Sequence, residues 1–220
     1  MIKRLLCALL ALVCLLSQAL AEETVISVDG NEITRAELKQ AVRLELFLGA
    51  LQCAGYGYAL DIVDPLTIED EMDKVVFALE DRIVIHNLAA EYGIALDEDD
   101  LLTAREDADA EWQKYRDIAF SDNGMAFLPA GNYEPADDPE ETVTRYFASF
   151  GLTYDALLER SCDWLLEEKL KAAYTKDMDG TEDELLMAFV EWQLEDFGTS
   201  EIIEDTDAII ELQATLWDDE

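Results

Sequence analysis

The stretch TIEDEMDKVVFALEDRIVIHNLAAEYG, residues 67–93, repeats apolar side chains at spacings of three and four, which is the repeat of one helical face. Thr67 with Asp70 forms a capping pattern at its start, and Gly93 suits the left-handed residue that follows many helix ends. The sequence therefore predicts a long helix buried along a single stripe, which consists of Ile68, Met72, Val75, Leu79, Ile83, His86 and Ala90.

Capping residues predict further helices on both sides of this one. Each is followed by apolar residues at helical spacing, and a last amphipathic segment covers residues 209–217. A β-branched run at 24–28, followed by an Asp-Gly-Asn turn, predicts one short strand. We expect a mainly α fold, an irregular multi-helix domain with a short N-terminal β element. The predicted helix starts are Thr34, Asp97, Asp138, Thr153 and Thr181.

Two stretches, residues 56–64 and 121–138, show no sustained period. The second contains two glycines and two prolines, which are frequent in loops because they interrupt regular structure. We therefore expect an irregular connector at 121–138, and any subdivision of the domain would fall there.

The N-terminus has the three parts of a secretory signal. Lys3 and Arg4 precede an apolar run over residues 5–16, and Ala19-Leu20-Ala21 matches a cleavage site. A membrane anchor would need about 18 apolar residues, and Ser17 interrupts this run. The sequence predicts a signal peptide at 1–21 and one domain at 22–220, exported to a periplasm, a cell envelope or the extracellular space.

The chain is strongly acidic, with 51 Asp and Glu against 15 Lys and Arg and a net charge of −36. Removing Lys3 and Arg4 with the signal changes this charge to −38. Such a field repels nucleic acid and anionic lipid headgroups, so basic or neutral polypeptides and divalent cations are the compatible partners. High acidity also serves solubility in secreted proteins, and this alternative stays open.

No catalytic motif is present in the sequence. A single histidine, His86, excludes a His-His metal pair, a parvulin-type histidine pair and an H-E-x-x-H zinc motif, and we expect it to be structural. The sequence has neither a G-x-S-x-G elbow nor a phosphate-binding glycine loop. Carboxylates are too abundant for any pair to indicate a glycosidase. We expect a non-enzymatic protein without a cofactor.

One acidic stretch and two cysteines raise the questions of a calcium site and of a disulfide. The stretch DMDG at 177–180 resembles the middle of an EF-hand loop, but Thr175 and Leu186 stand where the loop needs an aspartate and a glutamate, so we expect no metal site. Cys53 and Cys162 remain after signal cleavage, and an oxidising compartment permits a bridge between them. Free core thiols are the favoured alternative.

Three stretches resemble the SurA-type and PrsA-type foldases. They are VDGNEITRAEL at 28–38, the helix end with its Gly-Ile turn at 79–97, and the helix pair formed by 150–170 and 181–185. The resemblance covers the N-terminal, trigger-factor-like chaperone domain of that family. The connector at 121–138 is far too short to hold a parvulin domain, which argues against isomerase activity. The resemblance implies a domain that holds unfolded clients in an apolar crevice, and no catalytic residue is carried over.

Apolar side chains outside the helical stripes are the candidates for client contact, unless they pack only against their own loops. The expected function is that of an exported, ATP-independent chaperone-like protein that binds unfolded or partly folded polypeptides, basic ones preferred. The alternative is a non-catalytic adaptor or structural subunit that binds one folded partner. The candidate peptide-binding residues are Met125, Phe127, Leu128, Tyr133, Tyr56 and Tyr58.

Overall fold

The computed structural model describes residues 23–121 and 124–218, so the predicted signal peptide lies outside the described residues. The fold is mainly α with a small sheet, as predicted. Its elements, in chain order, are β1 (Thr24–Val28), β2 (Asn31–Thr34), α2 (Arg35–Gly55), α3 (Pro65–Glu91), α4 (Glu98–Phe120), α5 (Gly124–Phe127), α6 (Pro139–Ala148), α7 (Tyr154–Thr175), α8 (Glu182–Phe197), β3 (Ile202–Glu204) and α9 (Thr206–Thr215).

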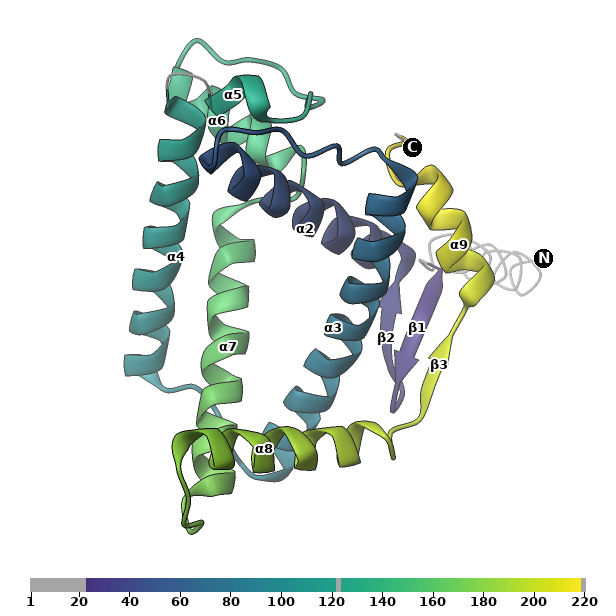
Figure 1. Ribbon diagram of the computed structural model, residues 1–220, viewed down its shortest axis with the longest axis vertical. Helices are drawn as coiled ribbons and strands as arrows, with labels where there is room; N and C mark the ends of the chain where they lie inside the picture. Colours follow the sequence, from purple (N-terminus) through teal and green to yellow (C-terminus); the bar gives the residue numbers. More distant parts are fainter. Residues whose placement is uncertain (1–22, 122–123, 219–220) are drawn as a thin grey trace, which may run out of the picture.

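Two helices, α3 and α7, run through the middle of the molecule (Figure 1). α2 lies across one end of α3, α8 crosses both helices at the other end, and α4 packs along α7. Side chains tie α3 to α7, because Arg82 pairs with Glu159 at 3.1 Å and His86 Nε2 lies 2.8 Å from Asp163 Oδ1. α3 is therefore the element against which α2, α7 and α8 are all arranged.

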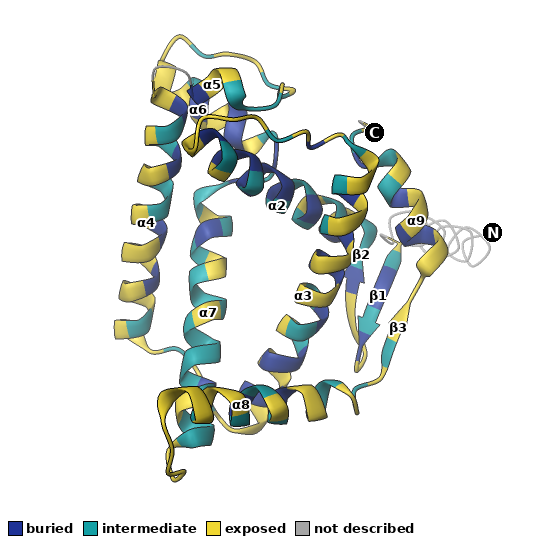
Figure 2. Ribbon diagram, viewed as in Figure 1, coloured by how far each residue is buried: buried dark blue, intermediate teal, exposed yellow. Residues whose placement is uncertain are grey.

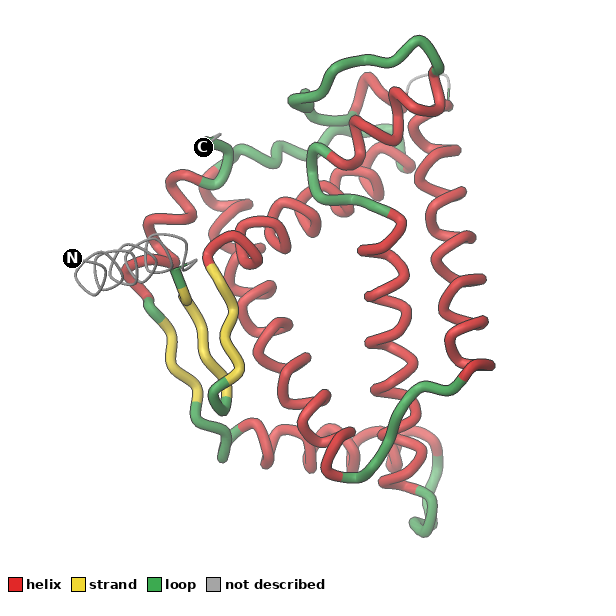
Figure 3. Tube along the Cα trace, turned by 180° about the vertical axis from the view of Figure 1, so that it is seen from behind, coloured by secondary structure: helices red, strands yellow, loops and turns green. Residues whose placement is uncertain are grey.

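The sheet has the order β2-β1-β3 and lies beside α3 (Figure 3). β1 and β2 form a hairpin whose turn places Asp29 and Gly30 at positive φ, 51° and 80°. β3 pairs antiparallel with the other edge of β1, with Ile26 opposite Glu204. The C-terminal part of the chain thus completes a sheet that the N-terminal part begins.

Most of the predicted helix starts are confirmed. Thr34, Asp97 and Thr181 each complete a capping box with the acidic residue three positions later. Thr153 accepts a hydrogen bond from the N–H of Ala156, and Asp138 caps α6. Each cap satisfies backbone N–H groups that the first helical turn leaves without a partner.

The predicted cap of α3 is wrong by three residues. Asp64 is the capping residue and accepts a hydrogen bond from the N–H of Thr67, while Pro65 occupies the first helical position. Proline is favoured there because its ring presets the helical φ and its missing N–H would have had no partner. Thr67 therefore lies inside the first turn.

The predicted single stripe of α3 is only partly correct. Ile68, Met72 and Val75 are buried, but His86 and Ala90 are exposed. Because α3 contacts α2, α7, α8, α9 and β1 at different heights, the buried face changes along its length. The buried residues that the stripe does not include are Val76, Glu80, Val84, Ile85, Leu88 and Ala89.

Three small elements are absent from the sequence-based expectation, which has one strand: they are β2, β3 and α5. β3 contains only three residues, too few for a period of two to be recognised, and α5 is a single turn within the stretch expected to be irregular. Cys53 and Cys162 are free and half-buried in the structure. The thiols are thus free, as the favoured alternative predicted, but neither belongs to the buried core.

An aromatic cluster joins α2 to α6 and α4. Phe47 is fully buried, stacks on Phe150 with ring centroids 4.3 Å apart, and meets the rings of Tyr146 and Phe147 edge-on. Trp112 of α4 meets Phe147 at 5.6 Å. Buried aromatic rings contribute large apolar areas, so this cluster anchors the end of the molecule opposite α8.

We predict that Phe47→Ala destabilises the fold by about 3–5 kcal/mol, because the cavity left at the centre of the cluster cannot be filled by backbone movement. Urea unfolding followed by circular dichroism measures the change. Leu102→Ala, on the exposed surface of α4, is the matched control and should cost about 0.5 kcal/mol or less. Equal effects of the two substitutions would contradict this assignment of the core.

Candidate functional site

Helix α8 has apolar side chains on two faces. One face packs inward through Phe189 and Trp192, and the Trp192 ring stacks on Tyr174 of α7 with centroids 4.2 Å apart. Tyr92, which follows α3, meets the same indole edge-on at 5.3 Å. The amide of Gln193 also donates to Asp81 Oδ1 of α3 at 2.7 Å. These contacts fix which side of α8 points toward the protein.

A neighbouring side of α8 carries the exposed apolar residues of this helix, and we call it the α8 face. At 100° per residue its members fall within an arc of about 100°. Met187 and Leu194 are 56% and 53% exposed, and along α8 exposed and half-exposed residues dominate (Figure 2). The ring of Phe197 reaches Phe77 of α3 at 5.3 Å, which extends the apolar surface onto α3. Val190 is half-exposed, and Phe197 is half-exposed and also packs against the core. The α8 face consists of Leu186, Met187, Val190, Leu194, Phe197 and Phe77.

Acidic residues border this surface. α8 contains six acidic residues and no lysine or arginine. Glu184, Glu191 and Glu195 are separated by seven and four positions, so they form a row along one edge of the α8 face. Glu184 is occupied by the cap at Thr181, whereas Glu191 and Glu195 have no ion-pair partner within residues 23–121 and 124–218.

The residues predicted from the sequence to contact clients divide into two groups. Tyr56, Tyr58 and Met125 are exposed, by 74%, 54% and 40%. The other three, Phe127, Leu128 and Tyr133, are half-buried; Leu128 and Tyr133 pack against the core, and Tyr133 meets the ring of Tyr146 at 5.2 Å.

The exposed three lie on elements that meet at one corner of the molecule, because α5 packs against both α2 and α4 (Figure 1). The end of α2 touches α4 there, since Gly55 faces the side chain of Ile118. Phe120, half exposed at the end of α4, belongs to the same surface. We call this surface the loop corner; it consists of Tyr56, Tyr58, Phe120 and Met125.

Sequence analysis did not identify the α8 face. The sequence predicts a helix after Thr181 and assigns its apolar residues, Leu185, Phe189, Trp192 and Leu194 among them, to one face. The signal that distinguishes two faces is the uninterrupted apolar run at 185–190, because six consecutive residues of a helix cover all of its sides. Such a run in a helix at the surface must leave some apolar side chains exposed.

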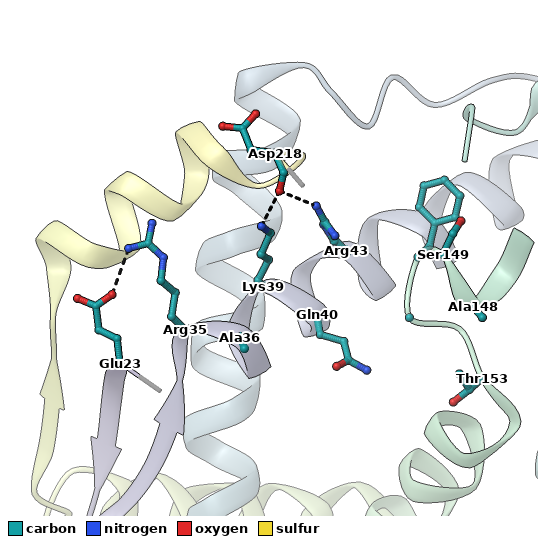
Figure 4. A pocket seen from close by; sticks show the side chains of 12 residues that line it. Glu23, Arg35, Ala36, Lys39, Gln40, Arg43, Ala148, Ser149, Thr153 and Asp218 are labelled. Carbon is teal, nitrogen blue, oxygen red and sulfur yellow. Dashed lines mark hydrogen bonds and ion pairs between the residues drawn. The ribbon is translucent and has the colours of Figure 1, made fainter. Parts of the chain in front are cut away.

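A cavity of about 680 Å³ lies between α2 and the turn from α6 to α7 (Figure 4). Arg35, Lys39 and Arg43 line it at intervals of four, on one face of α2. Arg35 pairs with Glu23 at 3.2 Å, and the other two donate to backbone carbonyls of Leu216 and Asp218. These cations therefore bind the end of α9, whose last carbonyls have no helical partner.

A second acidic feature lies where α3 meets β3. Glu80 is only 4% exposed, and its Oε1 has no hydrogen-bond partner in the described parts of the chain. Its carboxyl group lies close to that of Glu204 of β3. Burial and this neighbouring carboxylate raise the pKa of Glu80 to about 7. Burial also raises the pKa of Asp81, although the Gln193 amide partly opposes the shift.

Among the described residues, no three His, Cys, Asp or Glu side chains are arranged to hold a metal ion. No described helix is long and apolar enough to span a bilayer. Comparisons with protein-family models, with curated proteins and with solved structures found no match. The resemblance to SurA-type foldases therefore remains a prediction from the sequence.

The Glu80–Glu204 contact predicts how stability depends on pH. Because the pKa of Glu80 is raised on folding, its contribution to stability is complete below the ordinary value of 4.5 and is lost as the pH rises through about 7. Glu80→Gln, which cannot ionise, should therefore be more stable than the wild type at pH 8, by about 1–3 kcal/mol, and the gap should close near pH 4.5.

Chemical denaturation of both proteins between pH 4 and about 8 measures this gap. Glu106→Gln, on the exposed face of α4, removes the same charge without the burial and is the control. The stability gained by Glu80→Gln should change over this pH range, and Glu106→Gln should not reproduce that change. A constant gain, or the same change in Glu106→Gln, would show that the Glu80 carboxyl does not cause the pH dependence of stability.

Proposed function

We propose that this chain is an exported, ATP-independent chaperone-like protein that holds unfolded or partly folded polypeptides by reversible apolar contact. The observation that carries the proposal is the α8 face, a row of exposed apolar side chains on a helix that cannot turn them inward. Turning α8 to bury Leu194 would expose Trp192 and break its stack on Tyr174. An apolar patch that persists on a folded surface is typical of an interaction site.

The charge of the protein supports polypeptides as partners and basic ones in particular. A chain of net charge −36 attracts basic clients over a distance set by the ionic strength, about 10 Å at 0.1 M salt, and repels nucleic acid and anionic headgroups. The apolar contact that follows is not screened by salt. Long-range attraction would thus come from the charge of the whole chain, and short-range adhesion from the apolar residues of α8.

Holding a client in this way requires no chemical step. The sequence has no nucleotide-binding loop and no parvulin-type histidine pair, so the proposed activity depends on neither ATP nor proline isomerisation. Residues 1–21 have the pattern of a cleavable signal, which supports action in a periplasm, a cell envelope or outside the cell.

An adaptor that docks one folded partner is the second candidate. The observation that favours it is that the α8 face lies mostly on a single helix, which the Trp192–Tyr174 stack holds in place, so it presents one fixed stripe rather than a crevice. The two functions differ in selectivity. A chaperone binds several unrelated unfolded chains weakly, whereas an adaptor binds one partner tightly.

We predict that the mature protein slows the aggregation of unfolded clients without ATP. Light scattering of reduced lysozyme, a basic client, and of reduced α-lactalbumin, an acidic one, measures the effect at low and high salt. Protection of the basic client should be greater at low salt, and the difference between clients should shrink at about 1 M salt, where screening acts within roughly 3 Å.

Three variants locate the surface responsible. Met187→Ser with Leu194→Ser should remove most of the protection, because it places hydroxyls in the middle of the α8 face. Tyr56→Ser with Met125→Ser tests the loop corner in the same way, and Leu102→Ser on α4 is the control for an exposed apolar residue elsewhere. If neither client is protected at any salt concentration, the chaperone function is wrong and the adaptor function replaces it.

A further inference from the structure

We infer that the α8 face is a docking surface for a basic amphipathic helix of a partner polypeptide. The inference rests on the proposed function only in taking a polypeptide as the partner; it adds the conformation and the charge that this surface selects. The evidence is the shape of the surface, the row of carboxylates beside it and the poor fit of other occupants.

The dimensions of the α8 face suit a helix of similar length. The apolar row runs from Leu186 to Phe197, so it extends for about 17 Å at 1.5 Å per residue, along most of the 16-residue helix. An incoming helix that presents apolar residues at spacings of three and four can lay one row beside this row. Phe77 of α3 packs against Phe197 at one end of the row and is half exposed, so an incoming helix would also contact its ring.

The side chains of the row can adapt to a partner. Met187 is unbranched and more than half exposed, and Leu186 and Leu194 have similar freedom. Methionine fills irregular gaps because its thioether is flexible and polarisable. The inward face of α8, by contrast, is held by the Trp192–Tyr174 stack and by the Gln193–Asp81 hydrogen bond. The docking surface is thus adaptable at its contacts and fixed in its position.

The carboxylates determine the sign of the charge that a partner must carry beside the apolar row. Glu191 and Glu195 lie one turn apart along the edge of the apolar row, and neither has an ion-pair partner in the described chain. A helix docked on the row would place the residues that flank its apolar stripe beside them. Lysine or arginine at those flanking positions would form ion pairs, and acidic residues would be repelled.

Other occupants fit less well. A second copy of this chain would bring another α8, with its own six acidic residues, against the same carboxylates. An anionic bilayer is repelled by the net charge of −36. An extended apolar segment could cover the row, but it would leave Glu191 and Glu195 without partners. A basic amphipathic helix satisfies both the apolar row and its acidic edge.

The test uses three synthetic 16-residue peptides with a fluorescent label, a length that matches α8. The first places leucines at helical spacing with lysines on the flanks, the second is a scramble of the same composition, and the third replaces each lysine by glutamate. Fluorescence anisotropy measures binding to the mature protein, and circular dichroism measures helix gained by the peptide. We expect the first peptide to bind and to gain helix, and the other two to bind at least about tenfold more weakly.

Matched variants place the binding site. Met187→Ser with Leu194→Ser should weaken the first peptide about tenfold, and Leu102→Ser should leave its affinity unchanged. Glu191→Gln with Glu195→Gln should weaken it at low salt, and this effect should vanish at about 1 M salt. Glu106→Gln with Asp107→Asn removes the same charge from the exposed surface of α4 and should have a smaller effect.

Several results would overturn the inference. Equal binding of the scrambled peptide would mean that charge alone attracts it, and equal effects of the two carboxylate pairs would mean that the field of the whole protein acts. Aggregation protection without binding of the first peptide would refute this inference and leave the proposed function standing. Binding of that peptide at the α8 face without aggregation protection would support the inference and refute the chaperone function.

Discussion

The stack of Trp192 on Tyr174 is the contact on which the functional surface depends. It joins α8 to α7, while the hydrogen bond from Gln193 to Asp81 joins the same helix to α3. Both contacts lie on the inward side of α8, so they determine which apolar side chains remain outside. A helix with a single apolar face would have buried it and presented only polar groups. The second apolar face therefore exists because α8 has apolar residues on several sides and because its inward side is held by Trp192 and Gln193.

The scarcity of basic residues shapes the rest of the molecule. Several of the few cations connect separate elements, as Lys169 of α7 does with Asp97 at the start of α4 and Arg116 of α4 does with Glu140 of α6. Arg43 and Lys39 close the end of α9 in the same manner. The acidic residues outnumber these cations. Glu191 and Glu195 of α8 therefore have no ion-pair partner among the described residues and can pair with a basic group of an approaching molecule.

Local sequence signals predicted the helix starts well, because a cap depends on residues within one turn. Thr34, Asp97 and Thr181 needed no tertiary context. The face that α3 buries could not be predicted, since it depends on neighbours that contact the helix at different heights. Tertiary contacts also decided which candidate site residues are exposed. Met125 and Tyr56 are exposed, as expected, whereas Tyr133 packs on Tyr146. Predicting the α8 face would have required knowing which side of the helix Trp192 anchors.

The strand order β2-β1-β3 has a consequence for the time at which the fold can form. β1 is the central strand, yet one of its two neighbours, β3, lies about 175 residues further along the chain. A chain synthesised from its N-terminus cannot complete the sheet, or close α9 onto α2, until nearly all of it has been made, and pairing across so long a loop is slow. Until the last residues are made, the sheet of an unfinished chain thus lacks β3, and one edge of β1 has no strand to pair with.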